Sequence, residues 1–174
     1  MLNAQHAGQN IQLNQGYKME KIKQEYEKIK TRFNLPEFNE IDKEFELARI
    51  DIDKTSILTK EILRIIISRL ISFINSIEPG VNTPPQSLHA LIEISNLSDD
   101  DKREIFVFYK GISSLIHEGL VAEIETEKES AIFITKVWKQ WPEIRKKEKT
   151  FLQKIAKAWL KEDETDDELK KYMT

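Results

Sequence analysis

The stretch KTSILTKEILRIIISRLISFINSI, residues 54–77, decides the fold of this 174-residue chain. Its apolar residues recur at steps of three and four, which is the spacing of one face of an α-helix. Eight of its residues are isoleucine, a type that favours strands. Its length and its lack of Gly and Pro nevertheless predict a helix, because ordinary strands are much shorter. Apolar residues also fill much of its remaining surface, so we expect this helix to be buried at the centre of the fold.

Two helices are predicted on the N-terminal side of this stretch. Residues 19–33 carry an apolar stripe with helical spacing, bordered by Glu and Lys. A short acidic helix is predicted around Phe38, Ile41 and Phe45, which again follow helical steps. We expect its two phenylalanines to pack onto the core; the alternative is an acidic docking segment for a basic partner.

Further helices are predicted on the C-terminal side. A proline is common in the first turn of a helix, so one helix is predicted to start at Pro84. Ser98 is followed by three carboxylates, which suit the positive end of a helix, so another helix is predicted to start there. The apolar stripe of residues 142–161 predicts the last helix. The sequence therefore predicts an all-α protein, an irregular bundle of five to seven helices around residues 54–77.

Residues 120–135 leave two structures open. Two short β-friendly segments flank Glu127–Glu129, which is compatible with a small β-hairpin. The turn lacks Gly, Asn-Gly and Asp-Gly, however, and these are the usual hairpin signals. Helical steps continue through the same residues, so we favour helices over the hairpin.

The two ends of the chain differ in composition from the middle. Residues 1–18 are rich in Gln and poor in apolar residues, which predicts a disordered leader. Residues 162–168 hold six acids in seven positions, which predicts an acidic flexible tail over 162–174. Residues 19–161 would then form a single helical domain.

Composition excludes several classes of protein. The chain has no Cys, so disulfide frameworks and thiolate sites are excluded. With only five Gly it has no glycine-rich phosphate loop. No run of about 18 uncharged apolar residues is present, so we expect a cytoplasmic protein without a membrane span.

Candidate metal ligands and catalytic groups are sparse. His89 and Glu93 have the spacing of ligands on one helix face, but a metal site needs a third ligand. The acids of residues 99–101 suit a helix cap better than a cation site. We therefore expect no metal, no cofactor and no catalytic residue.

Residues 136–161 have the most chemical character. They combine nine bases and two acids with three tryptophans. Cations can neutralise phosphates while aromatic rings stack on bases, although a solvated face over a Trp-anchored core explains the same residues. The candidate interaction patch consists of Lys136, Trp138, Lys139, Arg145, Lys146, Lys149, Lys154 and Lys157.

The function that this sequence favours is a non-catalytic helical protein-interaction module or a subunit of a larger assembly. Its expected partner is another protein, because paired blocks of opposite charge are common at interfaces. The alternative is a nucleic-acid-binding protein, either winged-helix-like over 98–135 or acting through the basic helix 136–161. The acidic pI of about 5.8 counts against the alternative.

Overall fold

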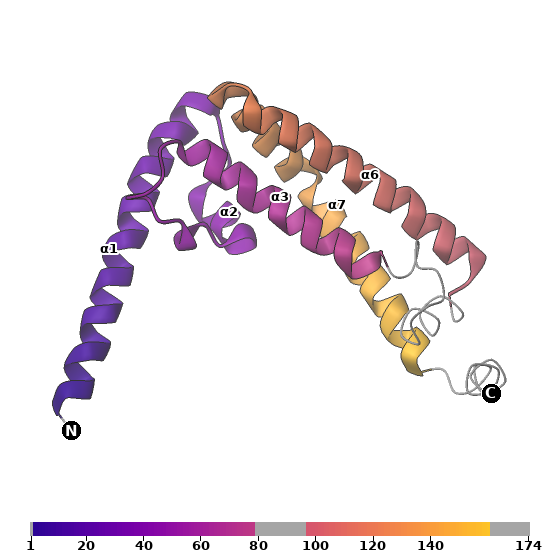
Figure 1. Ribbon diagram of the computed structural model, residues 1–174, viewed down its shortest axis with the longest axis horizontal. Helices are drawn as coiled ribbons and strands as arrows, with labels where there is room; N and C mark the ends of the chain where they lie inside the picture. Colours follow the sequence, from indigo (N-terminus) through magenta and orange to yellow (C-terminus); the bar gives the residue numbers. More distant parts are fainter. Residues whose placement is uncertain (1, 79–96, 161–174) are drawn as a thin grey trace. The chain divides into compact units, whose positions relative to one another are not determined.

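The computed structural model describes residues 2–78 and 97–160, and these ranges contain helices but no strands (Figure 1). The prediction of an all-α protein is therefore confirmed for this part of the chain. The predicted helix that starts at Pro84 and the acidic tail lie outside the described residues. The helices are α1 (Leu2–Phe33), α2 (Phe38–Phe45), the 3-10 turn η1 (Leu47–Arg49), α3 (Leu58–Ile77), α6 (Asp99–Ile124) and α7 (Glu127–Leu160).

The chain divides into two compact units. The first contains Met1–Arg69 and Glu118–Gln140, and the second contains Leu70–His117 and Trp141–Thr174. Helices α3, α6 and α7 each contribute residues to both units. The single domain expected over 19–161 stays a prediction.

The first unit is built around fully buried residues of α1 and α2. Ile22 and Tyr26 lie on the predicted stripe of α1, and both are inaccessible to solvent. The hydroxyl of Tyr26 donates a hydrogen bond to the carbonyl of Pro36 at 2.9 Å, and its ring meets Phe38 edge-on at 5.3 Å. Burial raises the pKa of Tyr26 far above its ordinary value, so the hydroxyl remains a donor.

Helix α2 packs through the residues that its spacing predicts. Phe38, Ile41 and Phe45 are all buried, and the ring of Phe45 lies 6.5 Å from that of Trp138. The expectation that the two phenylalanines anchor this acidic helix is thus confirmed. Glu46 ends α2 in the left-handed conformation, with a φ of 56°.

Helix α1 differs from the prediction at its start and agrees at its end. The helix begins at Leu2 rather than Met19, so it runs through the residues expected to form a disordered leader. It ends where Asn34 takes the left-handed conformation, with a φ of 54°. The amide of Leu35 then donates to the carbonyl of Lys30 at 3.3 Å, a pattern that closes helix C-termini.

Removal of residues 1–18 tests whether this first part of α1 contributes to stability. We expect the melting temperature to change by less than about 2 °C, because residues 1–18 carry no helical apolar stripe to pack against the protein. A thermal melt followed by circular dichroism, with Met19 as the new start, provides the measurement. A drop of several degrees would show that the leader packs on the first unit.

The second unit contains a row of three phenylalanine rings from three helices. Phe73 of α3 meets Phe108 of α6 edge-on at 5.4 Å, and Phe108 lies 5.4 Å from Phe151 of α7. Phe73 and Phe151 are buried, as are Leu70 and Ile77 of α3. Residues 54–77 therefore supply core side chains, as predicted, although the helix itself begins at Leu58.

Residues 120–135 are helical on both sides of a tight turn, so the β-hairpin alternative is wrong. Helix α6 continues to Ile124, and α7 starts at Glu127 and runs back antiparallel to it (Figure 1). Thr126 caps α7, because its hydroxyl accepts the amide of Glu129 at 3.3 Å. The helical interpretation prevailed because this segment has a capping residue and lacks the glycine of a hairpin turn.

Candidate functional site

Helix α7 carries all eight residues of the predicted patch, but two of its lysines already have partners. Lys136 forms an ion pair with Glu118 of α6 in the first unit. In the second unit the ammonium of Lys154 lies 2.6 Å from Asp101 and 2.9 Å from Glu104. These lysines connect α7 to α6 within each unit, and their charges are compensated.

The tryptophans of residues 136–161 are packing residues where the structure describes them. Trp138 is half-buried beside Phe45, and Trp141 is buried. The side chain of Trp159 lies outside the described residues. The aromatic stacking surface on which the nucleic-acid interpretation partly rests is therefore not present at Trp138 or Trp141.

The remaining cations of the patch form an exposed row on α7. Arg145 lies 3.6 Å from Glu148 one turn further along the helix. The other four form no ion pair with any residue in the described part of the chain, and they lie away from the buried Phe151 on the helix surface. These four exposed residues are Lys139, Lys146, Lys149 and Lys157.

Ser98 caps the start of α6, and the carboxylate of Asp101 takes part in this cap. The hydroxyl of Ser98 accepts the amide of Asp101 at 3.2 Å and donates to its carboxylate at 2.6 Å. Lys154 first, and Ser98 second, lower the pKa of Asp101 below its ordinary value of 3.8. The acids Asp101 and Glu104 raise the pKa of Lys154 in turn. The pKa of Asp101 is lower in the folded state than in the unfolded state. The ionised carboxylate therefore stabilises the fold above pH 3.8, and this stabilisation is lost as the pH falls through the folded-state pKa.

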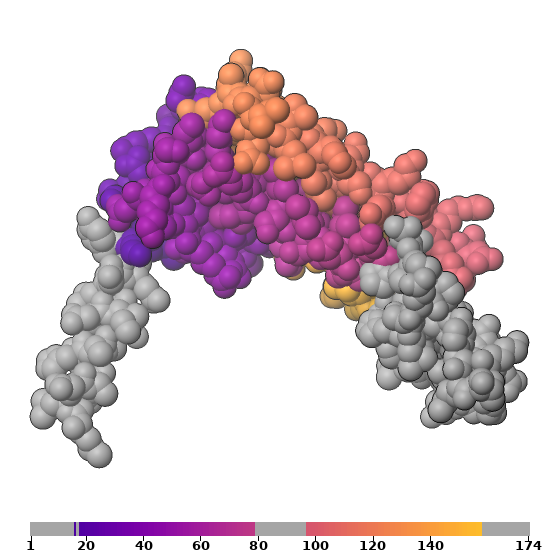
Figure 2. All heavy atoms as spheres, in the orientation of Figure 1, coloured from indigo at the N-terminus to yellow at the C-terminus, as the bar shows by residue number. Residues whose placement is uncertain are grey.

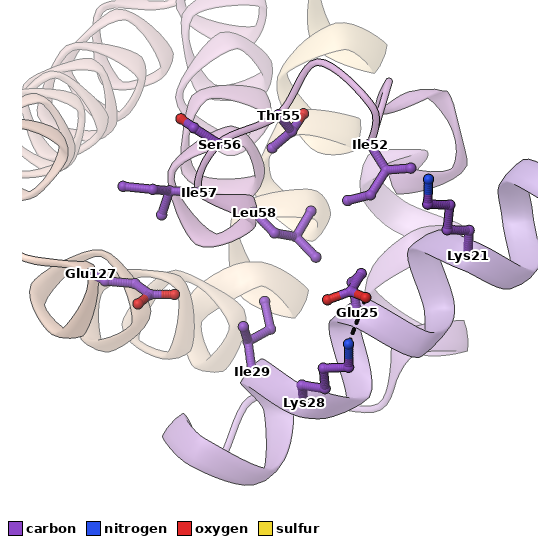
Figure 3. Close-up of a pocket in the computed structure, with 10 residues that line it drawn as sticks. All are labelled: Lys21, Glu25, Lys28, Ile29, Ile52, Thr55, Ser56, Ile57, Leu58 and Glu127. Carbon is purple, nitrogen blue, oxygen red and sulfur yellow. Dashed lines mark hydrogen bonds and ion pairs between the residues drawn. The ribbon is translucent and has the colours of Figure 1, made fainter.

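A pocket of about 400 Å³ lies in the first unit between α1, the segment before α3, and the start of α7 (Figure 3). Ile29, Ile52 and Leu58 converge on its middle, and charged side chains form its rim. Lys28 is held at 2.6 Å by Glu25. The remaining rim charges are paired too: Lys21 with Asp53, and Glu127 with Arg32 at 3.0 Å.

The charged side chains of this pocket are engaged in ion pairs. Its charged groups are compensated, and no histidine lines it. Glu127 also accepts a hydrogen bond from Thr59 at 3.3 Å, so its carboxylate ties α7 to α3. The pocket rim thus consists of structural ion pairs of the first unit.

Candidate metal ligands do not cluster in the described part of the chain. His117 is exposed, and its Nδ1 donates to the carbonyl of Ser113 at 2.7 Å. His89 and Glu93 lie outside the described residues, so that pair stays a prediction.

Helix α6 has exposed apolar residues that its sequence pattern did not predict. Five of its large apolar side chains have exposed fractions between 45% and 80%. The opposite face of the same helix is buried through Ile105, Ile112 and Leu115. The turn after α6, orange in Figure 2, lies at the molecular surface. The exposed residues are Phe106, Val107, Leu120, Val121 and Ile124.

Because both of its faces are apolar, α6 is also the one described helix that is long and apolar enough to cross a membrane. A third of the apolar window is buried within the protein. Two of its acids pair with other helices in the first unit: Glu123 lies 2.6 Å from Arg64 of α3, and Glu118 pairs with Lys136 of α7.

Comparison of the chain with protein-family models, with curated proteins and with solved structures gives no match in any of the three.

Proposed function

We propose that this protein is a non-catalytic helical interaction module and that the exposed face of α6 is its contact surface for another protein. The carrying observation is that Leu120, Val121 and Ile124 are exposed where α6 ends in the first unit; Phe106 and Val107 are exposed in its second-unit part. Scattered single apolar residues are normal on a protein surface, but several on one face mark an interaction site. We also propose that the protein is cytoplasmic and that its helices form a bundle around residues 54–77.

The spacing of the exposed residues supports contact with a helix. In the first unit Leu120 and Ile124 lie four residues apart on α6, and Val121 flanks them. Helices that dock side by side use this pattern as their anchors. Within the first unit, the ion pairs of Glu118 and Glu123 hold the end of α6 in place, so Leu120, Val121 and Ile124 are presented on a fixed helix.

Val121→Glu tests the proposal. The side chain is 57% exposed, so a charge should leave the fold and the melting temperature unchanged. We expect the variant to lose proteins that the wild-type chain retains in affinity purification from its native organism, measured by quantitative mass spectrometry. Leu152→Glu on α7 is the matched control, because Leu152 is also exposed but lies on another helix. Equal retention by wild type and Val121→Glu would contradict the proposal.

Nucleic-acid binding is the second candidate, and the exposed lysines of α7 are the observation that favours it. Its winged-helix form lacks support, because residues 120–135 form no strands. Its basic-helix form retains Lys139, Lys146, Lys149 and Lys157 but not the described tryptophans. Phosphate contacts by these cations would be sequence-independent.

Salt dependence separates this candidate from the first. If the lysines neutralise phosphates, affinity for a single-stranded oligonucleotide falls with a log–log slope of about −0.7 per contact. Charge reversal at Lys146, Lys149 and Lys157 would then abolish binding without unfolding the protein. We expect no binding at about 0.15 M salt, where the Debye length is about 8 Å, because the chain carries more acid than base. Micromolar or tighter binding would reverse the order of the two candidates.

A further inference from the structure

We infer that three exposed lysines of α7 in the second unit bind the acidic segment 162–168 of the same chain, which thereby covers them against other anions. The lysines are Lys146, Lys149 and Lys157, and we call them the lysine row. Both the row and the segment belong to the stretch Trp141–Thr174 of the second unit. The inference goes beyond the proposed function, because that proposal concerns the end of α6 in the first unit.

The lysine row follows a single line along the solvent side of α7. Lys146 and Lys149 are three residues apart. Gln153 follows four residues after Lys149, and Lys157 follows four residues after that, so helix periodicity places these side chains on one side of the helix. All four are exposed. The opposite side of the helix packs into the second unit through three buried side chains, Ile144, Phe151 and Ile155.

The charge of the lysine row is not compensated within the described part of the second unit. None of the three lysines forms an ion pair with a residue that the structure describes. The only acid between Lys146 and Lys157 in the sequence is Glu148, which pairs with Arg145 at 3.6 Å. In this unit the acids of α6 that contact α7 are engaged by Lys154. Because like charges one turn apart on a helix repel each other, an anionic occupant would stabilise the row.

The segment that follows α7 carries the complementary charge. Residues 162–168 hold six acids in seven positions, and they begin two residues after the described end of the helix at Leu160. Opposite charges on two surfaces give a contact its orientation and its specificity. Because the segment is covalently attached, its effective concentration at the row is on the order of millimolar, which favours it over free anions.

The length of the segment matches the length of the lysine row. Along the helix, Lys146 lies about 21 Å before Leu160, at about 1.5 Å per residue. The eight residues 161–168 span up to about 26 Å when extended, at about 3.3 Å per residue. A chain that turns back at Lys161 can therefore place an acid beside each lysine of the row.

Amine acetylation, resolved by mass spectrometry of the full chain, tests the contact. We expect the lysine row to react about fivefold more slowly in wild type than in an amide variant, because three weak surface ion pairs together give a difference of this order. The protection should disappear at about 1 M salt, where the Debye length is about 3 Å. The amide variant replaces every acid of the segment: Glu162→Gln, Asp163→Asn, Glu164→Gln, Asp166→Asn, Asp167→Asn and Glu168→Gln.

Lys139 is the control within the same chain. It is exposed on α7 but lies seven residues before the row, in the first unit, so its reaction rate should be the same in wild type and in the amide variant. Equal rates for the lysine row in the two chains would overturn the inference. Protection that persists at 1 M salt would overturn it too, since charge would then not be the cause. Equal protection of Lys139 would show a general effect of net charge and would likewise overturn it.

A cysteine pair tests the position of the segment, because the chain contains no cysteine of its own. Gln153→Cys lies within the lysine row and Thr165→Cys within the acidic segment, and neither change removes a charge. In a glutathione buffer we expect this pair to form its disulfide several times faster than Leu152→Cys with Thr165→Cys, because Leu152 is exposed on a different side of the helix. In the amide variant the two pairs should react at equal rates. Equal rates in the chain that keeps its acids would overturn the inference.

Discussion

Phe73→Ala is expected to lower the free energy of unfolding by about 3–5 kcal/mol. Phe73 is buried, and its ring packs edge-on against Phe108, which in turn contacts Phe151. Truncation removes the buried ring and also the aromatic contact, and it leaves a cavity that three helices cannot close without moving. Urea unfolding followed by circular dichroism measures the change as a shift of the midpoint.

A matched substitution on the same helix serves as the control. Ile71→Ala removes apolar atoms from a side chain that is 40% exposed, so we expect a cost below about 1 kcal/mol. Ile66→Ala truncates a buried isoleucine in the first unit and should cost about 2–5 kcal/mol. If Phe73→Ala and Ile66→Ala both proved nearly neutral, the assignment of α3 as a core helix would be wrong.

Gly119→Val is expected to destabilise the protein by about 2–3 kcal/mol through overpacking. A Cβ atom at Gly119 would lie 2.9 Å from the ring of Phe133 and 3.0 Å from Ile67. Both neighbours are buried, so neither can move aside freely. The glycine is needed here for close approach of α6 to α7 and α3, since its backbone is ordinary α-helix. Chemical denaturation again measures the effect.

Gly111→Val isolates the steric cause. Gly111 lies in the same helix, but a Cβ atom there would meet nothing within 4 Å. The intrinsic helix propensities of Gly and Val differ little, so we expect a change within about 0.5 kcal/mol. Equal losses at both positions would attribute the effect to helix propensity rather than to contact with Phe133.

The helical fold was predictable because local patterns and tertiary packing agree. The stripes of α1, α2 and α3 identify Ile22, Phe38 and Ile62 as core residues, and each is buried. The boundaries were less predictable. The start of α1 at Leu2 follows from continuation of the helix beyond its apolar stripe, and nothing in the composition of residues 1–18 indicates it.

The candidate surface proposed from the structure differs from the patch predicted from the sequence for a physical reason. Charge is conspicuous in a sequence, so residues 136–161 stood out, yet Lys136 and Lys154 are engaged in ion pairs with α6. Which lysines are compensated depends on tertiary contacts that no local pattern shows. The exposed apolar residues of α6 were also visible in the sequence. The helix prediction needed only the stripe that includes Ile105, Ile112 and Leu115, so the additional apolar residues were not recognised as exposed.

The tight turn between α6 and α7 has a consequence for the order in which the chain folds. Contacts across it join residues close in sequence: the hydroxyl of Ser130 donates to the carbonyl of Ala122, eight residues earlier. The ion pair of Arg32 with Glu127 instead closes a loop of 95 residues. Loop-closure entropy grows with length, so the α6–α7 hairpin can form early at small cost, and α1 docks onto it later.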